Sequence, residues 1–456
     1  MIILVGGDLV LPDRLLPFVS LIIDGTRIVA VAPDQGVDRR DATTVDVASC
    51  YVVPGFIDVH VHGVDGYDTM DEGDSVAEIA SRLPRYGVTA FCPTTIACGP
   101  KVLRAVLDKV ARERAAPRPD SARVLAAHLE SNFINPEYRG AQPVECLRVP
   151  CLADEPVKKS RFRSVRLQPD VPSPSMGGHD SECFTGSEAG RYVRRPSSVR
   201  DQEAVAFRRP GGFSASDILG VIADAGRTVG IVTLAPELPG AIELVRALVS
   251  AGHRVSLGHS GATLDEAMIA IDAGARHATH LFNRMTPMTH RAPGVAGAVL
   301  ARDEVTVELI CDGFHVHPDM CRVAIRSKGV GRVMAITDGT AGSGLSVGSA
   351  ARLGGQRIRV TKEGAVLDDG TRAGSTLTMD RAFRTIVGTF GCSVVEAAQM
   401  CSTTPARELG LIDVGILREN AYADLTVLDR QLEVVRTFVG GREVYSRDGT
   451  KRAGVR

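Results

Sequence analysis

The chain has 456 residues, 44% of them hydrophobic, so it can bury a large core and has room for more than one domain. A net charge of −1 offers no basic surface to nucleic acid or an anionic membrane, and the absence of tryptophan, with only 4% aromatic residues, argues against base-stacking platforms. No apolar run approaches the roughly 18 residues of a membrane span. The ten cysteines contain no C-x-x-C pair, which indicates reduced thiols. We therefore expect a cytoplasmic protein.

Both ends of the chain are predicted to form strands. Leu21–Ile23 and Ile28–Val31 flank Asp24-Gly25, a hairpin signal, and the first residues lack the features of a signal peptide. Residues 423–428 and 434–439 have the same strand character. Because chain termini often lie close together, we expect residues 1–54 and 401–456 to build one small β-sandwich domain.

Between the two ends, short apolar strands alternate with helical stretches, which is typical of a parallel α/β fold. Eight candidate strands end near His60, Phe91, His128, Leu234, Gly258, His280, Ile310 and Thr337. Eight such units predict a (β/α)8 TIM-type barrel over residues 55–355. Residues 356–400 are then a return segment with a substrate loop and the last barrel helices. The active site of a barrel lies at the C-terminal ends of its strands, which is where polar residues follow most of these strands.

Residues 151–210 interrupt this alternation. They are rich in Arg, Ser, Pro and Gly, and show no sustained apolar period of 2 or 3.6. A segment of this length without structure is unusual inside a compact domain. We expect a mobile insertion between the third and fourth barrel strands, with a basic lid over an anionic substrate as the alternative.

Five residues at the strand ends have the chemistry of metal ligands. His60 and His62 close the first strand, where residues i and i+2 point the same way, so both imidazoles can reach one metal. Glu130 ends an apolar strand and needs either a metal or a basic partner. His259 and His280 could each be a core histidine, but with Glu130 they form a set suited to zinc or iron with an open position for water.

Two further residues are candidates for catalysis and binding. Asp338 follows the eighth strand, where a carboxylate can take a proton from water and return it to a leaving amine. An N-cap role would also explain an aspartate at that position. Arg291 stands in the loop after the sixth strand and can bind phosphate bidentately, although a solvated surface arginine is the alternative.

An ordered series of short motifs connects these residues. The motifs span residues 54–63, 128–140, 233–237, 258–263, 279–297, 312–318, 336–339 and 374–379. The series resembles the N-acetylglucosamine-6-phosphate deacetylase family of metal-dependent amidohydrolases, over nearly the whole chain outside 151–210. The resemblance implies hydrolysis of N-acetyl-D-glucosamine 6-phosphate to D-glucosamine 6-phosphate and acetate by a metal-activated water, in amino-sugar catabolism.

The resemblance also assigns roles to individual positions. It implies that Glu130, His259 and His280 bind the main metal, and that Asp338 is the catalytic acid/base. His60 and His62 match positions that bind a metal in some members, so we expect one or two divalent ions, zinc first, with iron, manganese and cobalt as alternatives. Substrate-contacting positions are matched by Ala141, Gln142, Asn283, Arg284, Arg291, His315 and Ala373. The counterpart of Arg291 reaches towards a neighbouring subunit's site, which implies a homodimer.

The sequence departs from the family pattern at several positions. Ser131 and Asn132 replace a common Gly-Pro, Gln142 replaces a histidine, Arg284 a small residue and Ala292 an acid. Gln142 can still donate a hydrogen bond but cannot carry charge. Three alternatives stay open: a deacetylase of N-acetylgalactosamine 6-phosphate, an amidohydrolase acting on a cyclic amide, and a catalytically silent scaffold homologue. No lysine at a strand end supports the cyclic-amide alternative.

Overall fold

Eight parallel strands form the centre of the structure, a computed structural model that describes residues 1–33, 40–150 and 212–449. They are β6 (Phe56–Val61), β9 (Val88–Thr95), β11 (Ala127–Glu130), β12 (Val229–Leu234), β13 (Arg254–Leu257), β14 (His277–Ala278), β15 (Thr306–Ile310) and β16 (Val333–Ile336). Neighbours pair in chain order. Residues just past β16 return to β6 through the Val61–Gly339 bridge and a 2.9 Å bond from Asp338 N to His60 O. The predicted barrel is confirmed as nearly closed.

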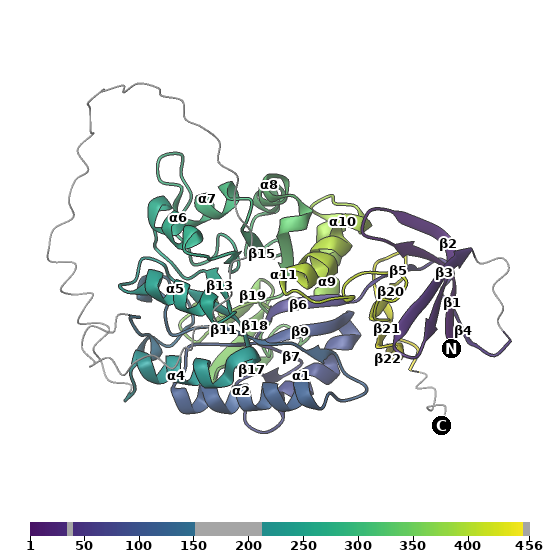
Figure 1. Ribbon diagram of the computed structural model, residues 1–456, viewed down its shortest axis with the longest axis horizontal. Coiled ribbons are helices and arrows are strands. Elements are labelled where there is room, and N and C mark those ends of the chain that lie inside the picture. The colour runs from purple at the N-terminus through teal and green to yellow at the C-terminus, as the bar shows by residue number, and fades with distance from the viewer. Residues whose placement is uncertain (34–39, 151–211, 450–456) are drawn as a thin grey trace, which may run out of the picture.

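Helices surround the barrel (Figure 1). They are α1 (Ser75–Arg82), α2 (Pro100–Ala115), α4 (Ala215–Ala225), α5 (Ala241–Ser250), α6 (Leu264–Asp272), α7 (Gly294–Ala301), α8 (Pro318–Lys328), α9 (Met379–Gly388), α10 (Val394–Ala398) and α11 (Thr404–Glu408), the last two joined by the π-helical turn Gln399–Thr403. In α2, the buried residues Leu103, Val106, Leu107 and Val110 follow the helical spacing that places them on one face. None of the helices in the described ranges is long and apolar enough to cross a membrane.

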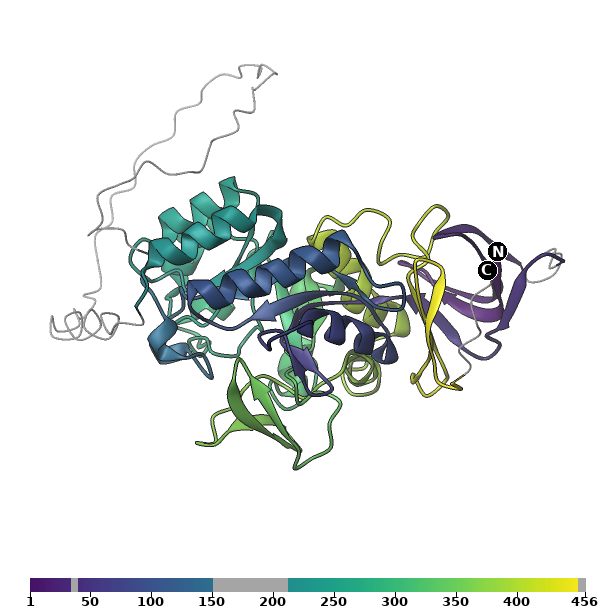
Figure 2. The same cartoon turned by 90° about the horizontal axis from the view of Figure 1, so that it is seen from below.

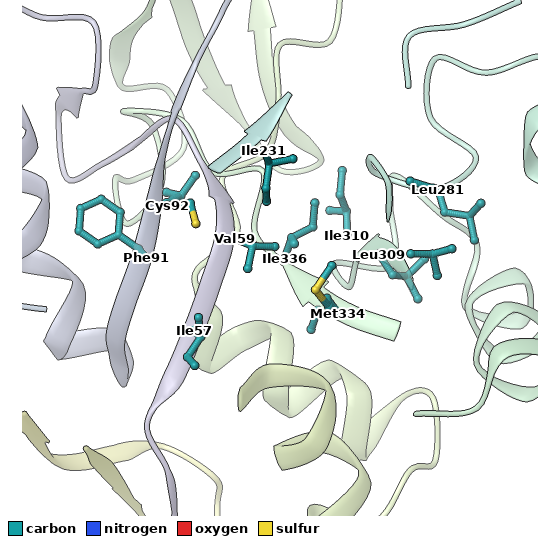
Figure 3. Packing of buried hydrophobic residues seen from close by; sticks show 14 of the residues in the cluster. Ile57, Val59, Phe91, Cys92, Ile231, Leu281, Leu309, Ile310, Met334 and Ile336 are labelled. Atoms are coloured by element: carbon teal, nitrogen blue, oxygen red, sulfur yellow. The ribbon is translucent and has the colours of Figure 1, made fainter. Parts of the chain in front are cut away.

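Six of the eight barrel strands are buried along their whole length, and β12 and β13 are buried except for one half-buried residue each, as expected when helices cover a parallel sheet. Figure 3 shows their apolar side chains gathered in one cluster, with Val59, Ile231, Ile310 and Ile336 among them. The same cluster reaches the helices, since Phe56 stacks on Phe383 of α9 with ring centroids 5.2 Å apart.

Two strand boundaries differ from the sequence prediction. The second barrel strand, β9, continues past Phe91 to Thr95. The sixth, β14, is only His277–Ala278, and Thr279 follows it with its amide bonded to Leu257 O at 3.0 Å. His280 then adopts a positive φ of 30°, a conformation in which no strand continues. The predicted insertion at 151–210 lies outside the described residues.

Strands from both chain ends form the small β domain beside the barrel, where the purple and yellow strands of Figure 1 meet. They are β1 (Ile2–Val10), β2 (Leu15–Asp24), β3 (Arg27–Pro33), β4 (Thr43–Asp46), β5 (Tyr51–Pro54), β20 (Leu425–Leu428), β21 (Val434–Val439) and β22 (Arg442–Ser446). The hydrogen-bonded order is β22-β21-β20-β5-β1-β2-β3, with β4 also pairing with β1. Side chains from both ends share one core, as Leu4, Leu21, Val427 and Phe438 show. Both chain ends therefore contribute to one small β domain, as the sequence predicted.

Three smaller groups of strands complete the described fold. The antiparallel sheet β17 (Ala350–Leu353), β18 (Gln356–Thr361) and β19 (Gly364–Leu367) projects from the barrel in Figure 2. A hairpin of β7 (Gly63–Val64) and β8 (Tyr67–Asp68) follows β6 directly, and β10 (Arg123–Val124) extends the barrel sheet beside β9. Residue 400 lies in the π-helical turn between α10 and α11, so our proposed boundary there falls within helical structure rather than at a strand.

Candidate metal and active site

The side chains of four histidines and one glutamate, from the ends of four strands, lie close together. His259 Nε2 and His280 Nε2 lie 3.0 Å apart, and each is 3.0 Å from Glu130 Oε1. His60 Nε2 lies 3.5 Å from the same Glu130 oxygen and 3.3 Å from His62 Nε2, which is 3.5 Å from Glu130 Oε2. All five side chains are buried. The five ligands predicted from the sequence are therefore neighbours in space.

The cluster divides into two groups that share Glu130. The ligand atoms of His60, His62 and Glu130 lie within 4.8 Å of one another, and so do those of Glu130, His259 and His280. Imidazole nitrogens and carboxylate oxygens are the donors that zinc and iron accept. Imidazole nitrogens face one another at about 3 Å, and neutral rings alone cannot satisfy the hydrogen-bonding capacity of all these atoms. A cation between them therefore fits this donor set. The residues present therefore suit one or two divalent ions.

The electrostatics of the cluster favour positive charge at its centre. Burial lowers the pKa of His60 and His62, but nearby carboxylates outweigh it and raise these pKa values to about 9 and about 10. In the opposite sense, burial raises the pKa of Glu130 and Asp338, but the histidines hold both pKa values below their usual range. A bound metal ion would supply the positive charge that these carboxylates attract.

Asp338 lies at the edge of the same cluster. Its Oδ1 is 3.3 Å from His62 Nε2 and 3.4 Å from His60 Nε2, and the residue is 7% exposed. Gly374 packs against it: a Cβ there would lie 2.8 Å from Asp338 O. The carboxylate is thus held beside the metal-ligand groups with an opening to solvent, as a group that exchanges protons with water must be.

Three of the site residues have a left-handed backbone. His259, His280 and Asp338 have φ values of 49°, 30° and 48°. This conformation is uncommon for residues other than glycine and costs energy that the surrounding structure must offset. Each residue lies two positions past the last residue of its strand, and the turn directs the side chain into the cluster.

Gln142 is fixed between the cluster and a neighbouring loop. Its Nε2 donates to Glu130 Oε2, and its Oε1 accepts from the backbone amide of Ala97 at 2.7 Å. The side chain is buried. Gln142 therefore holds the orientation of Glu130 and keeps one further amide hydrogen for another acceptor.

The remaining residues expected to contact substrate lie around the cluster. His315 Nδ1 donates to Asp312 Oδ2 at 2.6 Å, and its ring approaches Gly364 of β19. Burial lowers the pKa of His315, but Asp312 and Asp338 raise it above its usual value. Asn283 donates to the carbonyl oxygens of the preceding turn, at 3.3 Å.

Ala141 and Ala373 pack against the core of the β17–β19 sheet, and Ala141 O accepts from Gln356 at 2.8 Å. Arg284 is exposed and lies against Gly140, where a Cβ would be 2.8 Å from its Nε. Arg291 is exposed on the loop before α7. The structure therefore places Arg284 beside the segment that carries Gln142. The side chain of Arg291 is accessible from solvent.

Two buried carboxylates behind the cluster were missed in the sequence. Glu308 of β15 lies 2.8 Å from His60 Nδ1 and 3.0 Å from His277 Nε2. Asp58 of β6 accepts from Thr337 N at 3.3 Å and from Thr337 Oγ1. Both could have been recognised in the sequence, because each is a lone charged residue within an apolar strand. A charge buried in such a strand needs partners.

A third group of potential ligands, His60, His128 and Glu308, is occupied by protein contacts. His128 Nδ1 donates to Val59 O at 3.0 Å, and its Nε2 lies 2.8 Å from Thr233 Oγ1. Burial lowers the pKa of His128 to about 3, so its ring is neutral. Because both ring nitrogens already have partners, His128 is a structural histidine.

Comparison with known proteins identifies the family. The profile of the Amidohydrolase family matches residues 222–444. An N-acetylglucosamine-6-phosphate deacetylase from Lysinibacillus sphaericus is 31% identical over 412 residues, covering 90% of this chain and 88% of the relative. The chain belongs to the N-acetylglucosamine-6-phosphate deacetylase family.

Two other relatives illustrate the range of this deacetylase family. The solved structure of a D267A mutant of the Mycobacterium smegmatis N-acetyl-D-glucosamine-6-phosphate deacetylase, in complex with N-acetyl-D-glucosamine-6-phosphate, is 29% identical, with a TM-score of 0.76 over 98% of this chain and 99% of the other. An N-acetylgalactosamine-6-phosphate deacetylase from Escherichia coli O157:H7 is 31% identical over 429 residues, covering 92% of this chain and 93% of the relative. Relatives of comparable similarity thus carry either sugar in their names.

Proposed function

We propose that the protein hydrolyses the acetamide of N-acetyl-D-glucosamine 6-phosphate, releasing D-glucosamine 6-phosphate and acetate, as a step in amino-sugar catabolism. The observation that carries this proposal is the buried cluster of Glu130, His259 and His280 with Asp338 beside it, in a chain whose relatives bear that activity in their names. An intact cluster of this kind argues against a catalytically silent scaffold.

We assign the main metal to Glu130, His259 and His280, and a second ion to His60 and His62 with Glu130 between them. Zinc is the first candidate because four of the five donor residues are imidazoles, with iron, manganese and cobalt as alternatives. When bound, the metal would polarise the acetyl carbonyl and lower the pKa of a water molecule.

Asp338 is the acid/base in this proposal. Its lowered pKa keeps the carboxylate ionised and able to accept a proton from the attacking water. The same carboxyl group then gives the proton to the amine as the carbon–nitrogen bond breaks. Its Oδ1, 3.3 Å from His62 Nε2, is within reach of a water molecule in the cluster.

Gln142 supplies a neutral donor near the reacting carbonyl. Ala97 and Glu130 hold its amide in one orientation, so its remaining N–H needs no reorganisation to meet the developing oxyanion. An amide does not titrate, and we therefore expect this donor to act equally at every pH.

We assign the phosphate of the substrate to the polar residues that surround the cluster. Arg291 and Arg284 provide guanidinium groups that can grip phosphate bidentately, and Asn283 and His315 provide neutral or cationic donors. Ala141 and Ala373 line the sugar. Binding energy from the phosphate, remote from the bond broken, positions the acetyl group. The proposal includes a cytoplasmic homodimer in which Arg291 serves the neighbouring subunit's site.

A substrate panel tests the reaction and its sugar. Purified protein supplied with zinc is assayed for acetate release from N-acetylglucosamine 6-phosphate, N-acetylgalactosamine 6-phosphate, unphosphorylated N-acetylglucosamine and a cyclic amide. We expect the highest kcat/KM on the first compound. Preference for the galactosamine epimer would support the second candidate, which is favoured by the Escherichia coli relative. Turnover of the cyclic amide alone would refute the proposal.

A further inference from the structure

Glu308 is a buried carboxylate that the proposed chemistry does not use. It stands in β15, is 0% exposed, and lies against four histidines, of which His128 is the most distant with its Nδ1 3.6 Å from Glu308 Oε1. Its Oε2 lies 2.8 Å from His60 Nδ1 and accepts from His280 N at 3.2 Å, while its Oε1 is 3.0 Å from His277 Nε2. An isolated charge in this position would be costly, so these contacts must hold the carboxylate in place.

The contact with His60 determines how that ring meets the metal position. An ionised carboxylate only accepts hydrogen bonds, so Nδ1 of His60 carries the proton that points to Glu308. The other nitrogen, Nε2, then presents a lone pair towards His62 and Glu130. This is the tautomer that a metal ligand needs.

The other ligand histidines are held differently. His259 Nδ1 donates to the backbone oxygen of Tyr138 at 2.8 Å. Within the described part of the chain, Nδ1 of His62 and Nδ1 of His280 have no hydrogen-bond partner. His60 is thus the ligand whose outer nitrogen meets a carboxylate, which both orients the ring and makes its inner nitrogen more basic.

We propose that Glu308 is a positioning residue that fixes the tautomer and orientation of His60, and thereby controls occupancy of the second metal position, formed by His60 and His62. The inference rests on the proposed metal site. It predicts that a change at Glu308 weakens binding at the second metal position only. Glu308 contacts the ring of His60, which belongs to the second position, but only the backbone of His280, which belongs to the first.

Asp58 offers a matched control for the loss of a buried charge. It too is a wholly buried carboxylate on a barrel strand. It bonds to Thr337 and to the backbone amide of His60 at 3.2 Å, but to no ligand ring. Replacing either carboxylate by its amide therefore perturbs the barrel similarly, while only the change at Glu308 alters a contact with the imidazole ring of a proposed ligand.

The experiment compares metal-free wild type, Glu308→Gln and Asp58→Asn by dialysis against graded free Co²⁺, with elemental analysis and visible absorption of the bound ion. We expect wild type and Asp58→Asn to bind two ions. Glu308→Gln should keep the first and lose about 10- to 100-fold in affinity for the second, the usual effect of removing an outer partner. Circular dichroism checks the fold, and Glu308→Asp replaces the glutamine variant if that one does not fold.

Two results with the variants would overturn the inference. One is unchanged binding of both ions by a folded Glu308 variant. The other is an equal loss of both ions in the Glu308 and Asp58 variants, which would reveal a general structural effect. Wild type that binds a single ion would also overturn it, but would leave the proposed function intact. Wild type that binds no Co²⁺ would instead refute the metal site itself.

Discussion

Side chains at the ends of the barrel strands reach the site through strained backbone. His259, His280 and Asp338 each adopt a left-handed φ, at a cost of about 1–3 kcal/mol apiece. Contacts such as the close packing of Gly374 on Asp338 maintain that conformation. Substitutions at these positions should therefore be chosen to tolerate positive φ, and asparagine does so better than most residues.

Asp338→Asn tests the proton-transfer role with little disturbance of the backbone. The amide has the same shape and accepts positive φ, but cannot take a proton from water. We expect kcat to fall by roughly two to four orders of magnitude while zinc content stays the same. Steady-state kinetics and elemental analysis measure the two quantities. A kcat near that of wild type would move the role to another group.

Arg291→Ala tests phosphate recognition. Because Arg291 is exposed and its proposed partner is the phosphate, kcat/KM should fall by roughly tenfold or more for the phosphorylated sugar, equivalent to losing a charge-assisted hydrogen bond. Turnover of the unphosphorylated sugar should hardly change. Arg246→Ala, at an exposed position on α5, is the control. Equal losses on both sugars would indicate that Arg291 merely orders its loop.

At the residue scale, the sequence predicted the cluster of candidate ligands because each lies at or just past the end of an apolar strand, and all such ends meet at one rim of a barrel. Glu308 and Asp58 lie within their strands rather than at the ends, so that rule did not select them. The partner of Gln142 was not predictable either, since Ala97 is distant in sequence and meets it through the packing of two loops.

At the element scale, apolar periodicity located the barrel strands but not their lengths. β9 continues to Thr95 because its final residues remain buried on both faces. β14 is short because the left-handed turn at His280 follows almost at once. The β17–β19 sheet was not predicted, since it departs from the alternation of strand and helix that revealed the barrel.

Asp58→Asn tests how β6 and β16 are joined. Burial raises the pKa of Asp58 to about 7 in the folded state, compared with roughly 4 when unfolded. Its contribution to stability is therefore complete below about pH 4 and is lost as pH rises through 7. Asparagine does not titrate. Between pH 5 and pH 8, the free energy of unfolding of the variant should therefore rise relative to that of wild type by up to a few kcal/mol.

Urea unfolding of both metal-free proteins at pH 5 and pH 8 measures this difference. Asp13→Asn, a change at an exposed aspartate, is the control for the general effect of removing one carboxylate. If the free energies of unfolding of wild type and Asp58→Asn differ by the same amount at both pH values, the prediction is contradicted.

At the scale of the whole molecule, the proposed metal site joins strands that are far apart along the chain. Its ligands come from the ends of β6, β11, β13 and β14. An ion that binds only the folded state adds about 2.7 kcal/mol of stability at a concentration 100 times its Kd. We expect removal of metal with a chelator to lower Tm by at least several degrees, and zinc to restore it.

Differential scanning calorimetry of the metal-free and zinc-loaded protein measures that shift. Glu130→Gln, which alters the ligand shared by both groups, should show a much smaller increase on adding zinc. Magnesium at the same concentration is the control, because it prefers oxygen donors and should bind this histidine-rich cluster poorly. An identical Tm with and without zinc would contradict the prediction.

The pairing of β5 with β20 has a consequence for biosynthesis. β5 leads directly into the first barrel strand, yet one of its two neighbours is made from residues 425–428. At ordinary elongation rates, the ribosome needs roughly half a minute to a minute to travel from one to the other. During that time Tyr51–Pro54 presents an open strand edge, the kind of surface that recruits other chains. Nascent chains arrested before residue 425 should therefore depend on chaperones more than the finished protein does.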